Sequence, residues 1–112
     1  MNEFIEYLNN MVAQGKAEVE RLTADGRKDD ANFASVRMNI YDVCRTVSNA
    51  LANRPGAGLG AVKAQFERFK AIWGAALEKA KEHDDVRNVA IEEIKLAALN
   101  DVIAHFKEVS RE

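Results

Sequence analysis

The chain has 112 residues, of which 47% are hydrophobic and 30% are charged, and its formal net charge is −2. This length suits one domain and is too short for two ordinary ones, so we expect residues 1–112 to form a single domain. A charge so close to zero argues against a nucleic-acid-binding protein, which normally carries a basic face. The single cysteine excludes an internal disulfide.

No stretch approaches the roughly 20 consecutive apolar residues that cross a bilayer, so we predict no membrane partner. The first residues lack the basic start and apolar run of a signal peptide. We therefore expect a cytoplasmic protein.

Four segments repeat apolar side chains every three or four positions, which is the pattern of an amphipathic helix. The first covers residues 2–24, and Gly26 is suited to the left-handed position that ends it. The second covers about 30–53, with Asp29 or Asp30 as its N-cap. It has to stop there because Pro55 disfavours helical geometry in the residue before it.

After a connection from Pro55 to Gly60, a third helix is predicted over about 60–83. The apolar stripe then loses its register near His83, and Asp84 or Asp85 can cap a fourth helix over about 85–110. Helices of similar length joined by short connections are typical of an all-α, antiparallel, up-down-up-down four-helix bundle. We expect a buried set drawn from all four helices: Leu8, Val19, Ile40, Val47, Phe69, Trp73, Leu99 and Ile103.

Residue types that carry catalysis or bind metals are few, and each has a structural explanation. His83 and His105 lack the glutamate three residues earlier that di-metal bundles use. Asp101 and His105 are spaced to form a surface pair, and His83 suits the last turn of a helix. Cys44 lies on the apolar stripe and is expected to be a packing residue. The glycines at 56, 58 and 60 match no phosphate-binding motif. We predict no catalytic residue, no metal and no cofactor.

A polar stripe on the second helix is the strongest candidate for a partner-binding site. Its residues repeat every three or four positions beside the core edge: Arg37, Tyr41, Arg45 and Ser48. Two guanidiniums and a phenol can grip an acidic partner or a phosphorylated ligand. The same side chains can also lie over the first helix and pair with its glutamates.

The fourth helix carries more apolar surface than one bundle face needs. A core-facing helix normally has an apolar arc a little over 100° wide, whereas here apolar side chains cover about half of the cylinder. One edge is expected to be a dimer face on the surface: Ile91, Ile94, Ala98, Val102 and Val109. Twofold pairing is the commonest way for identical chains to cover such a strip. The alternative is that a splayed bundle encloses this helix more fully.

These features favour a small non-enzymatic module that binds another protein or forms a homodimer through the fourth helix. The alternative is a bundle that binds a small molecule in an apolar pocket lined by Phe66, Phe69 and Trp73.

Overall fold

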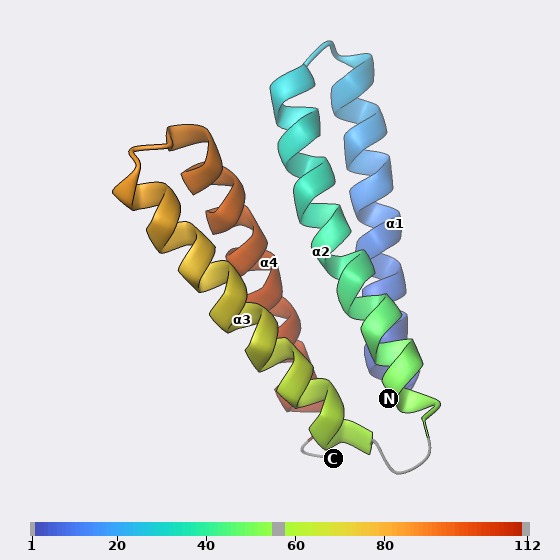
Figure 1. The fold of residues 1–112 in the computed structure, drawn as a ribbon. Helices are drawn as coiled ribbons and strands as arrows, with labels where there is room; N and C mark the ends of the chain where they lie inside the picture. The colour runs from blue at the N-terminus through green and yellow to red at the C-terminus, as the bar shows by residue number, and fades with distance from the viewer. Residues whose placement is uncertain (1, 55–57, 111–112) are drawn as a thin grey trace.

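The computed structural model describes residues 2–54 and 58–110 and consists of four helices. They are α1 (Asn2–Ala24), α2 (Lys28–Ala52), α3 (Gly58–Glu82) and α4 (Val86–Ser110), running alternately up and down (Figure 1). The predicted four-helix bundle is confirmed, and each predicted helix limit falls within two residues of the observed one. Of the predicted connection, residues 55–57 lie outside the described part of the chain. Among the described residues, no helix is long and apolar enough to span a membrane.

The two hairpin turns end their first helices in the same way. Gly26 has φ +75° after α1, as predicted, and its neighbour Arg27 donates its backbone N–H to the Leu22 carbonyl. After α3 the left-handed residue is Asp84 with φ 52°, which is unusual for a side chain other than glycine. Asp85 then caps α4, because its Oδ1 accepts from the Asn88 backbone N–H at 3.2 Å. The predicted break before Asp85 is therefore confirmed.

The predicted N-cap of α2 is wrong. The helix begins at Lys28, its N-cap position is occupied by Arg27, and no side chain there caps the helix. Asp29 and Asp30 both lie inside the first turn, where carboxylates favour the positive end of the helix dipole. Asp30 also forms an exposed ion pair with Arg27 at 2.8 Å, which holds the turn between the helices.

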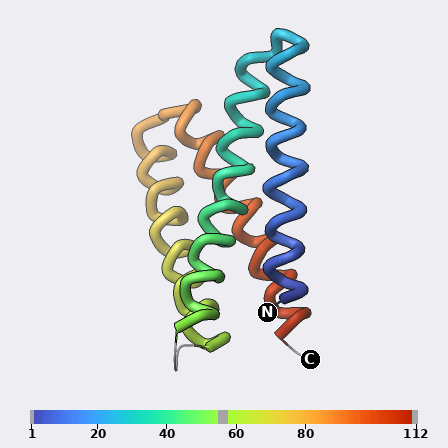
Figure 2. Tube along the Cα trace, turned by 90° about the vertical axis from the view of Figure 1, so that its right-hand side faces the viewer, coloured from blue at the N-terminus to red at the C-terminus, as the bar shows by residue number. Residues whose placement is uncertain are grey.

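The four helices form two hairpins that meet along α2 and α4. Each of these two helices packs against the three others, whereas the backbones of α1 and α3 stay further apart and these two helices meet through side chains such as Phe4 and Phe66. The first turn of α1, the end of α2, the start of α3 and the end of α4 lie at one end of the molecule, while the two hairpin turns diverge at the other (Figures 1 and 2). The radius of gyration of 15.1 Å exceeds the roughly 13 Å typical of a globular domain of this length. The bundle is therefore closed at one end and open at the other.

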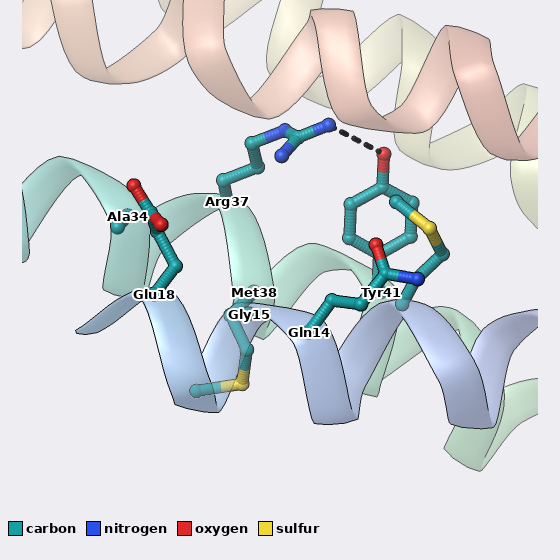
Figure 3. Close-up of a pocket in the computed structure, with 8 residues that line it drawn as sticks. Gln14, Gly15, Glu18, Ala34, Arg37, Met38 and Tyr41 are labelled. Atoms are coloured by element: carbon teal, nitrogen blue, oxygen red, sulfur yellow. Dashed lines mark hydrogen bonds between the residues drawn. The ribbon is translucent and has the colours of Figure 1, made fainter. Parts of the chain in front are cut away.

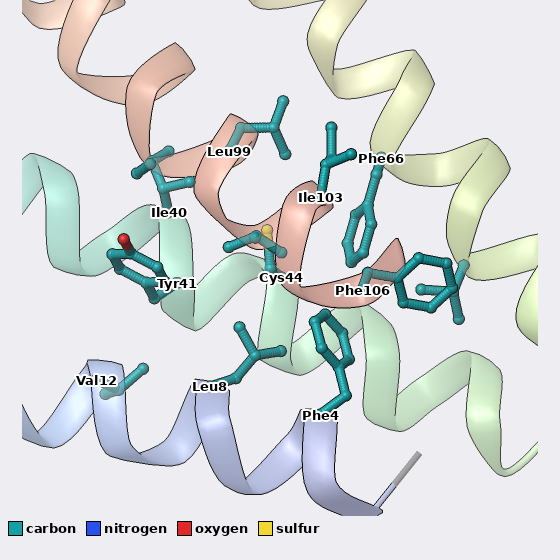
Figure 4. Close-up of a cluster of buried hydrophobic side chains, with 13 residues drawn as sticks. Phe4, Leu8, Val12, Ile40, Tyr41, Cys44, Phe66, Leu99, Ile103 and Phe106 are labelled. Atoms are coloured by element: carbon teal, nitrogen blue, oxygen red, sulfur yellow. The ribbon is translucent and has the colours of Figure 1, made fainter. Parts of the chain in front are cut away.

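The core occupies the closed half, which we define as residues 2–13, 40–52, 58–70 and 98–110. Phe4, Phe66 and Phe106 pack there with ring centroids between 5.3 and 6.1 Å apart. Figure 4 shows side chains from all four helices converging on this cluster: Phe4, Leu8 and Val12; Ile40, Tyr41 and Cys44; Val62 and Phe66; Ala98, Leu99, Val102, Ile103 and Phe106. Such packing of large apolar groups is the main term that stabilises a small bundle.

The open half comprises residues 14–24, 28–39, 71–82 and 86–97, and it buries far less. Within these ranges the buried side chains are Leu22, Ala31 and Ala80. Val86 is 81% exposed and Ile72 is 54% exposed, although both are large and apolar. The helices continue to the open end, but their apolar faces are only partly covered there.

The difference between the two halves bears on which of the residues predicted to be buried are in fact buried. Leu8, Ile40, Leu99 and Ile103 are buried as expected. The prediction is wrong for Val19, Val47, Phe69 and Trp73, which are only partly buried. Val19 and Trp73 belong to the open half. Val47 and Phe69 belong to the closed half but are only partly covered there, and Phe69 packs against the outside of the core cluster.

Candidate functional site

Arg37 and Tyr41 lie one turn apart on α2, and both extend from it toward α4 (Figure 3). The Arg37 Nη2 donates to the Tyr41 hydroxyl at 3.4 Å, and its guanidinium carbon is 5.5 Å from the centre of the Tyr41 ring. The guanidinium is therefore within range of a cation–π interaction with the Tyr41 ring, which holds the arginine side chain in place at modest energetic gain. The structure brings together these two members of the predicted stripe.

The Tyr41 hydroxyl in turn reaches the carboxylate of Asp101 on α4. It donates to Oδ2 at 2.9 Å, and the Tyr7 hydroxyl of α1 donates to the same oxygen at 3.5 Å. Three helices are therefore joined at one carboxylate. Burial raises the pKa of Tyr41, and the hydrogen bond to Asp101 raises it further, while Arg37 acts in the opposite direction. Burial, followed by the charges of Tyr41 and Asp101, also raises the pKa of Tyr7.

His105 completes this junction from α4. Its ring stacks on Tyr7 with centroids 3.8 Å apart and an interplanar angle of 10°. Asp101 and His105 are both exposed at residue level, as the sequence predicted. Asp101 accepts hydrogen bonds from Tyr7 and Tyr41, and His105 stacks on Tyr7. These two residues of α4 therefore contact α1 and α2.

The other two members of the predicted stripe do not face a partner. Arg45 forms an ion pair with Asp42 at 2.6 Å and donates to Asn9 on α1 at 3.2 Å. Ser48 is 0% exposed, and Tyr41 is 1% exposed. Tyr41 and Ser48, which the sequence placed beside the core edge, therefore lie inside the bundle. Arg37 is the exposed member.

A hollow opens beside Arg37, and we call it the inner hollow. Its volume is about 220 Å³, and it lies between α1 and α2 on the side from which α4 diverges (Figure 3). Its lining consists of Met11, Gln14, Gly15, Glu18, Ala34, Arg37, Met38 and Tyr41. Methionine side chains adapt to irregular shapes, so this lining suits an apolar side chain of variable form.

A second hollow, the outer hollow, spans the two hairpins at the open end. Its volume is about 370 Å³, and both α2 and α4 line it: Asp29, Asn32, Phe33, Val86, Arg87 and Ala90. Phe33, Arg37 and Tyr41 follow one another at intervals of four residues, so they lie on the same face of α2. Phe33 lines the outer hollow at one end of this face. We call the outer hollow, which lies between α2 and α4, the slot.

The predicted dimer face on α4 is wrong in part. Ala98 is 2% exposed and Val102 is 0% exposed, so both lie in the core of the single chain. Ile91, Ile94 and Val109 remain partly exposed. The reason is the contact of α4 with all three other helices, which encloses more of its circumference than one bundle face would. The alternative of a splayed bundle accounts for the excess of apolar residues at these two positions.

The three aromatic residues proposed to line a ligand pocket lie in different surroundings. Phe66 is buried in the core, edge-on to Phe106 at 5.7 Å. Phe69 and Trp73 stack on each other at 5.0 Å, and the Lys95 ammonium lies 5.1 Å from the Trp73 ring centre. This lysine also pairs with Glu92 at 3.2 Å. These contacts occupy the aromatic faces and give the pocket alternative no support.

Cys44 and the histidines lie where a structural role is expected. Cys44 is 0% exposed in the core, and burial raises the pKa of its thiol to about 12. Such a thiol is almost wholly protonated at neutral pH and is a poor nucleophile. His83 is exposed just beyond the end of α3. Within residues 2–54 and 58–110, no three histidine, cysteine or acidic side chains gather closely enough to hold a metal ion.

The sequence did not reveal the link from Tyr7 to Asp101. Tyr7 lies beside the core residues Phe4 and Leu8, and Asp101 lies one residue before the core residue Val102, so both positions border an apolar stripe. A polar group at such a border is a signal that it faces a neighbouring helix. Which helix it faces depends on the contact of α2 with α4, which no local pattern encodes. Comparison with family models, curated proteins and solved structures finds no significant match to this chain.

Proposed function

We propose that this chain is a non-enzymatic, cytoplasmic protein-interaction module that binds a partner protein through the slot at its open end. The observation that carries the proposal is the contrast between the two halves. The closed half holds the core cluster and exposes Val43 and Leu59 by 39% and 42%, whereas the open half leaves Val86 81% exposed in a hollow lined by α2 and α4. Exposed apolar surface next to a polar rim is typical of a binding site.

The non-enzymatic part of the proposal rests on the state of the chemically capable groups. The Cys44 thiol is buried and protonated. The Tyr7 and Tyr41 hydroxyls are both hydrogen-bonded to Asp101, and burial favours their neutral forms. These groups hold helices together rather than facing a substrate.

Affinity capture from an extract of the cells that express the protein tests this proposal. Wild type is compared with Phe33→Glu, which places a charge in the outer hollow, and with Val43→Glu, which changes a 39% exposed residue of the closed half. We expect a partner that wild type and Val43→Glu retain and Phe33→Glu loses. Partners retained equally by all three proteins would overturn the slot as the binding surface.

Self-association through α4 is the second candidate, and the partial exposure of Ile91, Ile94 and Val109 favours it. Light scattering on a size-exclusion column measures the mass directly. A dimer at tens of micromolar that Ile94→Glu dissociates without unfolding would establish this candidate. A monomer mass at that concentration would end it and leave the partner-binding proposal standing.

A further inference from the structure

The slot carries one charge on each of its two walls. Asp29 lines it from the first turn of α2, and Arg87 lines it from the first turn of α4. Within residues 2–54 and 58–110, neither side chain forms an ion pair, since the pairs found there join other residues. The two charges balance, so the lining favours neither an anion nor a cation as a whole. It favours a partner that presents a positive group to α2 and a negative group to α4.

The same two walls also carry apolar groups. Phe33 lies one turn after Asp29 on α2, and Val86 and Ala90 belong to α4. Val86 is 81% exposed and Phe33 is partly exposed, so the chain's own core leaves this surface uncovered. Contact with apolar side chains of a partner would remove it from water. The partner therefore needs apolar groups beside its two charges.

A second copy of the chain meets these requirements through its own slot. Because α2 and α4 both begin at the open end, a twofold axis that passes between them and runs along them sets α2 of one copy against α4 of the other (Figure 1). Asp29 of each copy then faces the partner's Arg87, and Phe33 faces the partner's Val86. A twofold interface uses the same patch on both copies, so each of these contacts forms twice.

We propose that the slot is the interface of a symmetric homodimer, in which α2 of each copy packs against α4 of the other and two Asp29–Arg87 ion pairs accompany the apolar contact. The proposal rests on the proposed function and identifies the partner at the slot as a second copy of this chain. It differs from self-association through α4 alone, because α2 supplies half of every contact. Arginine binds a carboxylate through two parallel hydrogen bonds, and such pairs fix the register of an interface.

Reversal of single charges tests this pairing directly. Asp29→Arg leaves two positive groups in the slot, and Arg87→Asp leaves two negative groups. In a symmetric dimer of either variant every charged contact opposes like charges, which strongly disfavours association. In a mixed dimer of the two variants, each contact again joins a positive group to a negative one. Both residues are exposed, so the reversals should leave the fold intact, and circular dichroism checks this.

The matched control variants are Glu67→Arg and Arg68→Asp. These two residues of α3 are exposed and line no part of the slot, and their reversals make the same two changes in net charge. They separate a local contact from a general effect of charge on association.

Sedimentation velocity over a concentration series measures the dimer dissociation constant. We expect wild type and both control variants to be dimeric at tens of micromolar. Asp29→Arg and Arg87→Asp should each raise the dissociation constant about tenfold or more, and their equimolar mixture should return to within about threefold of wild type. Phe33→Glu should also prevent association, because it places a charge in the apolar contact.

A monomeric wild type would overturn this inference. So would a dimer that Asp29→Arg and Phe33→Glu leave intact, because such a dimer would not use α2. A mixture of the two reversed variants that stays monomeric, although each keeps its helical circular dichroism, would equally contradict the pairing. The capture experiment decides the proposed function separately. If the purified chain is monomeric and Phe33→Glu loses a different captured protein, the slot remains a binding surface and the homodimer is wrong.

Discussion

The two ends of this bundle are built from the same four helices, yet they differ in how much they bury. At the closed end, aromatic and aliphatic side chains from all four helices meet in one cluster. At the open end, the described helices bury Leu22, Ala31 and Ala80, while Ile72 and Val86 stay largely exposed. A small bundle can therefore concentrate its stability in one half and leave the other half available for contact. The difference also shows that helix formation and core formation are separate outcomes of one sequence.

The largest difference between the halves is expected from a matched pair of isoleucines. Ile40 is 5% exposed in the closed half and Ile72 is 54% exposed in the open half. Ile40→Ala should lower the free energy of unfolding by about 2–5 kcal/mol, the usual cost of emptying a buried aliphatic site. Ile72→Ala should change it by less than about 1 kcal/mol. Urea denaturation followed by circular dichroism measures both, and equal losses would contradict the contrast.

Helix spacing at the inner hollow gives the next effect. A Cβ added at Gly15 would lie 2.6 Å from the Met38 Cγ and 2.7 Å from its Cβ, whereas one added at Gly74 would meet nothing within 4 Å. Gly15→Ala should lower stability by about 1–3 kcal/mol because α1 and α2 must move apart. Gly74→Ala should raise it by about 0.5–1 kcal/mol through helix propensity. If both substitutions stabilise the protein, the close approach of α1 and α2 is wrong.

The junction of Tyr7, Tyr41 and Asp101 in the closed half is predicted to respond to alkaline pH. Unfolded tyrosines ionise near pH 10, whereas the pKa values of Tyr7 and Tyr41 are raised in the fold. The unfolded state therefore releases its phenol protons first, so stability is full below pH 10 and falls as pH rises above it. The decline should be shallower in Tyr41→Phe. Denaturation curves from pH 7 to pH 11 measure this, and identical slopes for the two proteins would refute it.

The same junction should contribute a modest amount of stability at neutral pH. Tyr41→Phe removes a 2.9 Å hydrogen bond to a carboxylate and should cost about 1–3 kcal/mol. A double-mutant cycle with Asp101→Asn isolates the interaction, and a coupling energy near zero would mean that the contact joins the helices without stabilising them.

The labelling rate of Cys44 measures how readily the closed half opens. Because the thiol is buried and its pKa is raised to about 12, a thiol reagent should label it slowly in the native protein and quickly in denaturant. Rapid labelling of the native protein would show that the closed half opens readily and would revive a nucleophilic role.

The elements of this fold could be predicted from the sequence because local signals determine them. Apolar spacing located all four helices, and Gly26 and Asp85 act at their ends as their chemistry suggests. The start of α2 was misjudged because two aspartates that resemble an N-cap instead lie in its first turn. Such a one-turn ambiguity arises wherever several acidic residues precede a helix.

The arrangement of the helices could not be predicted in this way. Ala98 and Val102 were expected on the surface because an ideal bundle gives α4 one inner face, and the contact of α2 with α4 encloses them instead. The same contact turned Tyr41 inward onto Asp101 and left Arg37 beside the inner hollow. The candidate site therefore depends on a pairing of helices that are distant along the chain.

Native-state hydrogen exchange, read amide by amide, tests the central claim that the two halves differ in stability. Amides in residues 4–12, 41–48, 62–69 and 99–106 should exchange only through global unfolding, with a denaturant dependence equal to that of the whole protein. Amides in residues 17–23, 32–38, 74–81 and 90–96 should exchange through smaller openings that need less free energy. Equal protection in both sets, with one shared denaturant dependence, would contradict the account.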